Sequence, residues 1–369
     1  MIKADYVIVG SGLTGSTIGR ILTDHGQDVV ILDRKDHIAG NIYDYKHEES
    51  GAMIHKYGPH YFRCGSEKIW KFVNRFSEFY DWSSVLMSKV NGEYLNWPVQ
   101  HSYIEKIAGK EWNLFQGEPQ NFEEACLAKM PVQLYELFIK GYTEKQWGVK
   151  CVDLDKELAT RITINKSNVN TLTPNHKWNA LPRNGYTEMM RNMVEGIKMH
   201  LEYDYLQHKE EVVANKLLIF TGPIDEFFDY KFGKLKYRGQ QRRVEHLTDT
   251  QEYQPYIQVN YNSPEDPRIR TIEWKHLMHA DDKKNVNGTL LTHETPFTPE
   301  SPNQYEYPFP DKINKSLYEK YKAESETLDK VLICGRLGEY RYYDMDQAIG
   351  RAMNFATSIL EGLGITEKE

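Results

Sequence analysis

The sequence predicts an α/β protein in which a doubly wound parallel sheet carries an inserted α-helical domain and an antiparallel β-sheet domain. Residues 5–33 have the pattern of a strand, a glycine turn, a helix and a second strand. Residues 67–147 turn mainly helical, and residues 198–274 carry short alternating runs that favour antiparallel strands. A strand at 331–334 and a helix at 346–360 complete the chain. Its 369 residues exceed what one hydrophobic core usually supports.

The amino-terminal unit contains two apolar runs, YVIV at 6–9 and VVIL at 29–32, joined by the turn GSGLTG and a helical segment. In such a unit the first glycine permits a sharp turn. The second lets the backbone approach a pyrophosphate, and the third lets helix pack on strand. A carboxylate at the end of the second strand accepts hydrogen bonds from ribose hydroxyls. The unit therefore predicts a dinucleotide site built on Gly10, Gly12, Gly15 and Asp33.

Two further features bear on the identity of the dinucleotide. Arg34 lies next to Asp33, so charge alone leaves a 2′-phosphate open. Gly335 follows a carboxy-terminal strand, and an amino-terminal unit completed in this way is typical of proteins that enclose FAD; an ordinary strand-end turn is the alternative. We expect cofactor contacts from Gly10, Gly12, Leu13, Thr14, Gly15, Asp33, Arg34, Gly40, Asn41, His60, Gly335, Arg336 and Met345.

The remaining segments divide by pattern into helices, a loop and strands. Helical spacing occurs at 67–75, 102–107, 122–129 and 132–140, a polar loop at 165–179, and strand-like runs at 217–220, 242–247 and 256–261. The boundaries we expect are 1–66 and 311–369 for the cofactor domain, 67–150 for the helical domain, 151–197 for a mobile loop and return, and 198–310 for the antiparallel sheet interleaved with cofactor-domain segments.

Composition excludes several classes of function. Hydrophobic residues make up 40% and charged residues 27%, as in globular rather than disordered proteins. The 46 basic and 53 acidic residues are interspersed, so neither nucleic acid nor a membrane is the expected partner. Four cysteines without a CxxC pair, and a start that runs directly into a strand, predict a cytoplasmic protein without a metal site. The 25 tyrosines suit a pocket for rings and sugars.

Six segments together resemble one known family. They are GSGLTG at 10–15, YGPHYF at 57–62, KGYTEKQWG at 140–148, LPRNGYT at 181–187, RTIEWKH at 270–276 and GRLGEYRYYDMD at 335–346. They occur in the family's order over most of the chain, and the last is highly specific. The sequence resembles the flavin-dependent UDP-galactopyranose mutases.

The resemblance implies a Rossmann-like FAD domain with an inserted helical domain and an antiparallel sheet domain. It implies an isomerase that interconverts pyranose and furanose forms of a nucleotide-diphosphate sugar, a galactofuranose-forming step of cell-surface polysaccharide biosynthesis. An external electron donor reduces the FAD, whose N5 attacks the anomeric carbon and displaces the nucleotide diphosphate. Family members are commonly homodimers, which we expect here.

The leaving diphosphate calls for arginines and tyrosine hydroxyls around it. Arg270, Tyr307, Tyr342 and, more weakly, Tyr186 match such family positions. Arg336 matches the arginine that favours the anionic reduced flavin.

Other matches concern the base and the sugar. Tyr142 and Trp147 match positions that hold the nucleotide base and ribose. Phe138 lies one helical turn before Tyr142 and is expected to form a stacking wall, with an aromatic core stripe as the alternative. Asp344 matches a carboxylate of the substrate cleft, with a hydrogen-bonding role expected rather than proton transfer.

Two positions depart from the family pattern. Arg63 stands where the galactose enzymes have histidine, and arginine is a fixed planar cation rather than a neutral replacement. The loop arginine that clamps the diphosphate falls here on Asn165 or Lys166. Either Lys166 substitutes for it, or Arg63 compensates from the other side, or diphosphate binding is altered. These departures predict a substrate other than UDP-galactose, for example an N-acetylated sugar or a dTDP-deoxy sugar.

Two other functions remain as alternatives. An FAD oxidoreductase of the amine-oxidase type shares the nucleotide fold, although it needs an apolar cage rather than a set of Arg and Tyr side chains. An inactive sugar-nucleotide binder would also lack the clamp arginine.

Overall fold

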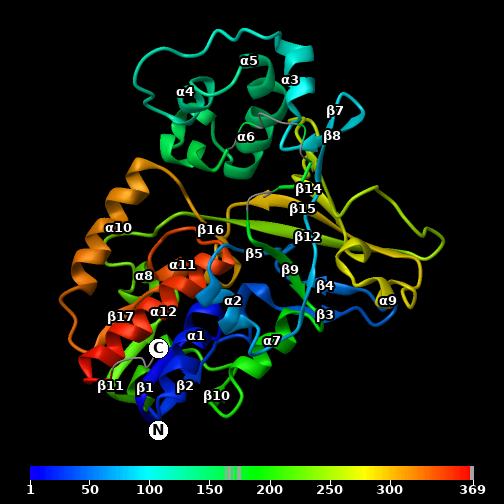
Figure 1. Ribbon diagram of the computed structural model, residues 1–369. Coiled ribbons are helices and arrows are strands. Elements are labelled where there is room, and N and C mark those ends of the chain that lie inside the picture. Colours follow the sequence, from blue (N-terminus) through cyan, green and yellow to red (C-terminus); the bar gives the residue numbers. More distant parts are fainter. Residues whose placement is uncertain (163, 165–167, 169, 173–175, 366–369) are drawn as a thin grey trace.

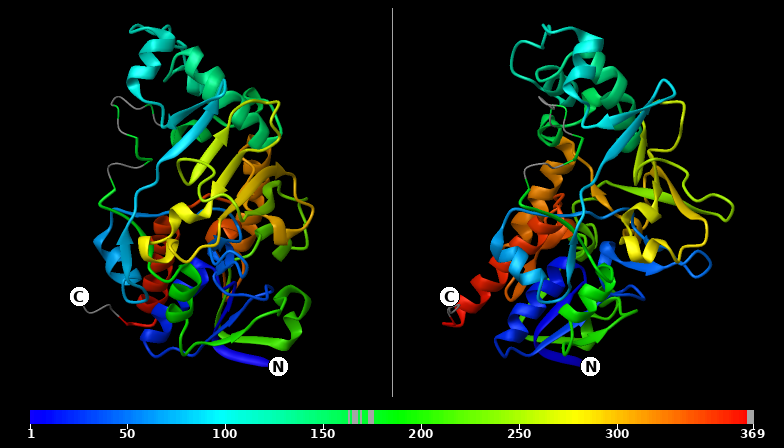
Figure 2. Two further views of the ribbon diagram at one scale, coloured as in Figure 1. Left: turned by 90° about the vertical axis from the view of Figure 1, so that its right-hand side faces the viewer. Right: turned by 45° about the vertical axis from the view of Figure 1, so that its right-hand side comes forward.

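The structure is a computed structural model that describes residues 1–162, 164, 168, 170–172 and 176–365. A parallel sheet lies at one end of the molecule, a helical lobe at the other, and a larger sheet lies between them (Figure 1, Figure 2). The parallel sheet has five strands in the order β10-β2-β1-β11-β17. Their bounds are Ile2–Val9 (β1), Val29–Leu32 (β2), Lys198–His200 (β10), Val212–Phe220 (β11) and Val331–Ile333 (β17).

Strand β11 corrects one expectation. Residues 217–220 are predicted to belong to the antiparallel sheet, but Leu217–Phe220 pair in parallel with β1, and β17 pairs in parallel on the other side. The run LLIF is continuously apolar, as is usual for parallel strands that are covered on both faces. In β1, Tyr6 and Ile8 belong to one apolar cluster and Val7 to another, because successive strand residues point to opposite faces.

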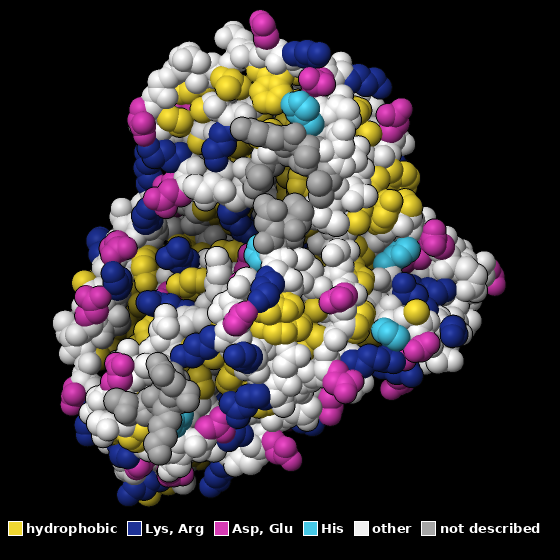
Figure 3. All heavy atoms as spheres, viewed as in Figure 1, with side chains coloured by type: hydrophobic (Ala, Val, Ile, Leu, Met, Phe, Trp, Pro, Cys, Tyr) yellow, Lys and Arg dark blue, Asp and Glu magenta, His cyan; other side chains and the backbone are white. Residues whose placement is uncertain are grey.

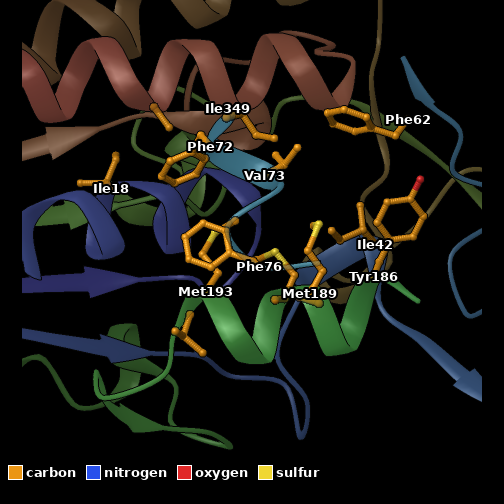
Figure 4. Packing of buried hydrophobic residues seen from close by; sticks show 14 of the residues in the cluster. Ile18, Ile42, Phe62, Phe72, Val73, Phe76, Tyr186, Met189, Met193 and Ile349 are labelled. Carbon is orange, nitrogen blue, oxygen red and sulfur yellow. The ribbon is translucent and has the colours of Figure 1, made fainter. Parts of the chain in front are cut away.

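Helices α1 and α12 pack against each other over one face of this sheet. Helix α12 begins after Asp344, whose backbone N–H donates to the side chain of Gln347. Side chains from α1, α2, α7 and α12 meet in the largest apolar cluster (Figure 4). The bounds of these helices are Leu13–Asp24 (α1), Glu67–Val73 (α2), Tyr186–Met193 (α7) and Met345–Gly362 (α12).

The central sheet has seven strands in the order β16-β12-β15-β14-β13-β7-β8. Its pairings are antiparallel except that of β13 with β7. The predicted runs 242–247 and 256–261 contribute to β12 and β13. The strand bounds are Leu86–Val90 (β7), Glu93–Trp97 (β8), Tyr237–Leu247 (β12), Gln258–Tyr261 (β13), Arg270–Glu273 (β14), Thr289–Phe297 (β15) and Tyr307–Pro308 (β16).

Strands β7 and β8 lie in a segment that is expected to be helical. They form a hairpin around Asn91 and Gly92, both of which have positive φ angles of 51° and 86°. An Asn-Gly pair between apolar runs is a strong hairpin signal, and the helical spacing of the flanking segments obscured it. The hairpin extends the central sheet towards the helical lobe (Figure 1).

The helical lobe packs around its own apolar cluster, which includes Ile104, Phe122 and Leu134. The predicted segments 102–107, 122–129 and 132–140 are helical, although residues 135–140 form a π-helix, and a further helix at 141–147 lies outside the predicted segments. The bounds are His101–Ala108 (α3), Phe122–Leu127 (α4), Val132–Leu134 (α5), Tyr135–Lys140 (π-helix) and Gly141–Trp147 (α6).

Two small sheets, four further α-helices and seven short 3₁₀-helices complete the fold of the described residues. No helix in the described part of the chain is both long and apolar enough to cross a membrane. The remaining bounds are Asp44–Lys46 (β3), Met53–His55 (β4), Phe62–Cys64 (β5), Phe79–Asp81 (β6), Trp178–Pro182 (β9), Ile224–Phe227 (α8), Ala280–Lys283 (α9), Lys312–Ser325 (α10) and Gly335–Gly338 (α11).

Candidate active site

A long cavity runs along the carboxyl ends of the parallel strands, the usual ligand position in such sheets. It encloses about 1250 Å³ of empty space, part of it open to solvent. The amino-terminal glycine turn and the carboxy-terminal Gly335-Arg336 turn lie on the same cavity, as predicted. Of the predicted cofactor residues, its lining includes Gly10, Gly12, Leu13, Thr14, Asp33, Arg34, Gly40, Asn41, His60, Gly335, Arg336 and Met345.

The three glycines of the first turn differ in how much space the protein leaves for a Cβ atom. Gly10 has φ +111°, and a Cβ there would lie 2.0 Å from Oγ1 of Thr221. A Cβ on Gly15 would lie 2.0 Å from the carbonyl oxygen of Gly10, which is the close helix–strand contact that the motif predicts. Gly15 does not line the cavity. A Cβ on Gly12 would meet nothing closer than 3.9 Å, so the protein itself leaves space there, on the cavity wall.

Asp33 orders the loops at one end of the cavity. Its Oδ2 accepts hydrogen bonds from the backbone N–H and the hydroxyl of Ser11, at 2.7 and 2.6 Å, and its Oδ1 accepts from the backbone of Lys35 at 2.9 Å. Carboxylate oxygens accept more than one bond, so Asp33 can still receive a ribose hydroxyl. Lys35 Nζ lies 4.0 Å from the ring centre of Tyr57 and donates to Oδ1 of Asn41.

Arg34 is committed to another residue. Its two terminal nitrogens donate to the two carboxylate oxygens of Glu226, each at 2.8 Å. A bidentate pair uses the side of the guanidinium that would otherwise bind a 2′-phosphate. The charge beside Asp33 is therefore balanced by protein, which argues against the phosphorylated cofactor that the sequence left open.

His60 reaches the cavity from the turn at residues 57–60. Among the described residues, its Nδ1 is buried without a hydrogen-bond partner. Burial lowers the pKa of His60 well below its usual value, so the ring is neutral at pH 7. Tyr186, only 1% exposed, donates from its hydroxyl to the carbonyl of His60 at 3.2 Å. This corrects the expectation that Tyr186 contacts substrate: it lies in the core and supports the His60 turn (Figure 4).

Three charged residues stand side by side on adjacent strands of the central sheet. The register pairs Arg242 of β12 with Glu294 of β15, and Glu294 with Arg270 of β14. Nε of Arg242 donates to Oε1 of Glu294 at 2.9 Å, and Nε of Arg270 donates to Oε2 at 2.5 Å. Although burial opposes ionisation of Glu294, the two arginines hold its pKa below the usual value. We call these three residues the ionic ladder.

Tyr342 lies between two arginines near the ladder. The guanidinium of Arg161 is 3.8 Å from its ring centre and that of Arg336 is 4.4 Å from it. Tyr307 stacks on Tyr342 with ring centres 6.1 Å apart, and burial raises the pKa of Tyr307 to about 12. Arg270 and Tyr342 each lie close enough to Tyr142 and to Tyr307 to affect the pKa of those two tyrosines. The structure therefore brings these four predicted substrate residues together.

Arg63 forms an ion pair with Asp344, with Nη2 and Oδ2 3.2 Å apart. Their side chains are 20% and 36% exposed. Asp344 thus stands at the start of α12 and pairs with Arg63, the residue that departs from the family pattern. Its role towards a substrate stays a prediction. Around the hollow between the helical lobe and the body, Lys and Arg side chains are prominent (Figure 3).

The aromatic residues of the helical lobe divide into two groups. Tyr142 and Trp147 lie on α6, and Trp147 contacts Phe309 edge-on at 5.7 Å. Phe138 is 3% exposed and packs among Trp97 and Tyr103 in the lobe's core. This corrects the expectation of a stacking wall, because the core-stripe alternative describes Phe138. Asn165 and Lys166 lie outside the described residues.

Sequence reasoning missed several residues of the site. Arg242 and Glu294 lie 52 residues apart and are brought together by strand register, and Glu306, which directly precedes β16, reaches Arg242 through its side chain. A charged residue facing inward on a strand is a signal for such a group, but the sequence does not reveal which face is buried. Lys35, which follows the recognised Asp33, could have been found as a basic residue in a cofactor loop.

The fold and the glycine-lined cavity define a dinucleotide-binding protein of the Rossmann-like class. The NAD(P)-binding Rossmann-like domain matches residues 8–76, and the UDP-galactopyranose mutase family matches residues 137–342. The chain belongs to the UDP-galactopyranose mutase family. The predicted family, fold class and enzyme class, an isomerase, are confirmed.

Individual relatives agree with this assignment. The chain is 31% identical to a probable UDP-galactopyranose mutase of Klebsiella pneumoniae, over 100% of this chain and 98% of that protein. It is 29% identical to dTDP-fucopyranose mutase of Escherichia coli, over 95% of this chain and 97% of that protein. A crystal structure of reduced UDP-galactopyranose mutase matches with a TM-score of 0.76 and 15% identity, covering 99% of this chain and 94% of the other. That match supports the fold.

Proposed function

We propose that this protein interconverts the pyranose and furanose forms of a nucleotide-diphosphate sugar with the help of bound reduced FAD. One observation carries the proposal: Arg336 belongs to both parts of the site. It lines the cofactor cavity, and its guanidinium lies 4.4 Å from the ring of Tyr342, next to the cluster that suits a diphosphate. A cofactor in the cavity and a sugar nucleotide beside Tyr342 would therefore meet at Arg336.

The residues of the cavity fit FAD. Two glycine turns border it at opposite places in the sequence, and Gly12 leaves open space on its wall. Nδ1 of His60 is a buried polar atom that lacks a partner among the described residues, and a ligand would satisfy it. Arg34 is balanced by Glu226, as suits a cofactor without a 2′-phosphate. When bound and reduced, a flavin supplies a nucleophile for the anomeric carbon.

The substrate side of the cleft suits a leaving nucleotide diphosphate. Burial opposes the charge of Arg270, but Glu294 raises its pKa well above the usual value, so this residue is a permanent cation. Tyr307, with a pKa of about 12, remains a hydroxyl donor at physiological pH. Fixed donors that point at developing negative charge accelerate such a step. Tyr142 and Trp147 on α6 would hold the base and ribose.

Arg63 bears on which sugar is accepted. It is already paired with Asp344, so one side of its guanidinium is taken while the rest remains for a ligand. A planar cation at this position favours a substituent with an acceptor oxygen, such as an N-acetyl carbonyl. The similarity to a protein named for dTDP-fucopyranose makes a dTDP-deoxy sugar the second candidate.

Product analysis tests the proposal. The protein, reduced with dithionite, is incubated with UDP-galactose, UDP-N-acetylgalactosamine and dTDP-fucose, and the products are separated by chromatography. We expect a furanose product from the reduced protein and none from the oxidised protein, with UDP-galactose not the fastest substrate. Absence of any furanose, with substrate-dependent flavin bleaching in oxidised protein, would instead support the amine-oxidase alternative. Fastest turnover of UDP-galactose would contradict the altered sugar preference alone.

A further inference from the structure

The ionic ladder holds Arg270 in an unusual way. Each oxygen of Glu294 is used by a different arginine: Oε1 by Arg242 and Oε2 by Arg270. Of the described residues, only Glu294 accepts a hydrogen bond from Arg270, and only through Nε. The terminal Nη groups of Arg270 therefore have no hydrogen-bond acceptor among the described residues, and Tyr307 and Tyr142 lie close enough to affect the pKa of this arginine.

An isolated arginine and carboxylate usually pair differently. They form two parallel hydrogen bonds, which use both oxygens and at least one terminal nitrogen. Nη2 of Arg270 and Oε1 of Glu294 both lie near Gly58, because a Cβ there would be 3.1 and 2.8 Å from them. The two atoms therefore lie against the same residue, and a second hydrogen bond between Arg270 and Glu294 would form through them. Arg242 already donates to Oε1 and so competes with Arg270 for that oxygen.

Glu306 keeps Arg242 in place. Its two carboxylate oxygens accept from the terminal nitrogens of Arg242 at 2.7 and 2.8 Å. The side chains of Arg242, Glu294 and Glu306 are 12%, 0% and 8% exposed. Two arginines and two glutamates balance one another, which makes the burial of four charges tolerable. Arg242 is therefore held in place by Glu294 and Glu306, which accept its hydrogen bonds without any ligand.

We infer that Arg242 is a positioning residue for Arg270: by occupying one oxygen of Glu294, it keeps the terminal nitrogens of Arg270 available to the substrate's diphosphate. The inference rests on the proposed function for the chemistry of the ligand, a nucleoside diphosphate. Without Arg242, Glu294 pairs with Arg270 through both oxygens, and one terminal nitrogen is withdrawn from the cleft. Loss of one charge-assisted hydrogen bond weakens diphosphate binding by about tenfold.

The test compares variants of the ladder in the flavin-loaded protein. Arg242→Met alone would leave Glu306 buried without its partner and could fail to fold, so the main variant is Arg242→Met/Glu306→Gln, which removes both charges of that pair. Glu306→Gln alone keeps Arg242 on Glu294 and should lose less affinity than the double variant. Arg243→Met is the matched control, because Arg243 is the next residue on β12 and its side chain is 66% exposed.

Binding of UDP and of dTDP is measured by calorimetry, and the crystal structure of the double variant is determined. We expect the Kd of UDP and of dTDP to rise about tenfold, and the substrate KM to change more than kcat. In the crystal structure of the double variant, Arg270 should form two hydrogen bonds with Glu294. The flavin spectrum should be unchanged. An unaltered affinity, an unmoved Arg270, or an equal loss in Arg243→Met would overturn the inference. Product formation by the unmodified enzyme tests the proposed function separately, so the two failures can be told apart.

Discussion

The two halves of the active site are built in different ways. The cofactor cavity is bordered by backbone: its first turn is six consecutive residues, of which Gly10 and Gly15 allow contacts that no side chain would permit. The substrate side is built from side chains on separate strands, and Arg242, Glu294 and Arg270 meet only because three strands pair in one register. The first half depends on local sequence, whereas the second depends on long-range pairing.

This difference predicts different responses to mutation. A backbone-built site tolerates no added atom where chain segments touch, but it depends only weakly on any one charge. A site built from a buried ladder tolerates small changes of shape, but removal of one charge leaves its partners unpaired in a dry interior. The following experiments separate these two kinds of dependence.

The largest effect is expected from Gly15→Ala. Its Cβ would lie 2.0 Å from the carbonyl oxygen of Gly10, so the first strand or helix α1 must move. We expect the free energy of unfolding to fall by about 3 kcal/mol and FAD to be lost. Urea unfolding of the apoprotein and flavin content measure both quantities.

Gly12→Ala is the matched control within the same turn. Gly12 has an ordinary φ of −72°, and its Cβ would meet no protein atom closer than 3.9 Å. The apoprotein should keep its stability to within about 0.5 kcal/mol, while FAD binds more weakly because the added methyl occupies the cavity wall. Equal loss of stability in both variants would contradict the distinction between the two glycines.

A smaller effect is expected from Glu294→Gln in the ladder. The substitution keeps the shape but removes a charge whose side chain is 0% exposed and which balances two arginines. The free energy of unfolding should fall by about 2 kcal/mol, below the usual 3–5 kcal/mol for a broken buried pair, because Glu306 still balances Arg242. Substrate KM should rise as Arg270 loses its anchor.

Glu245→Gln is the control for this change. Glu245 lies on the same strand as Arg242, but its side chain is 36% exposed and pairs with Arg243 and His293. Surface pairs contribute little, so the change in unfolding free energy should stay below about 1 kcal/mol. A Glu245 variant as unstable as the Glu294 variant would show that the ladder has no special role.

Prediction from sequence succeeded where the information is local. The glycine turn, Asp33 and the strand–helix order of the first unit follow from a few adjacent residues, and the structure has them in place. What the sequence alone does not determine is which strands pair with each other and in what register. Residues 217–220 could pair in either sheet by pattern, and the paired charges of β12, β14 and β15 become visible only once the strands are aligned.

Burial is the second quantity that the sequence left undetermined. Tyr186 occurs in a motif that matches a substrate-binding position, and Phe138 lies one helical turn before such a motif, yet they are 1% and 3% exposed. An aromatic residue in a motif can contact a ligand or support a neighbour that does, and both uses place it at the same point in the sequence. The hydroxyl of Tyr186 on the carbonyl of His60 shows the second use.

The smallest effect is expected from a change of pH. It arises from Lys35, a side chain that lines the cofactor cavity. Burial lowers the pKa of Lys35 from 10.5 to about 8, with Asp33 acting in the opposite direction. The unfolded chain therefore binds more protons than the folded apoprotein between about pH 8 and 10.5. It follows that this residue's contribution to the unfolding free energy increases as pH rises through that window. Below pH 8, by contrast, its ammonium group is present in the cavity and attracts the cofactor's phosphates.

Affinity for FAD should consequently fall by about threefold between pH 7 and pH 9.5, opposite in direction to the contribution of Lys35 to apoprotein stability. Flavin titration and urea unfolding across this range measure the two trends. In Lys35→Met both slopes should flatten, because no group remains to titrate over Tyr57. Lys231→Met, on the surface with Glu324, should leave both slopes as they are. An unchanged slope in Lys35→Met would place the pH dependence elsewhere, and the cofactor half would then depend on backbone alone.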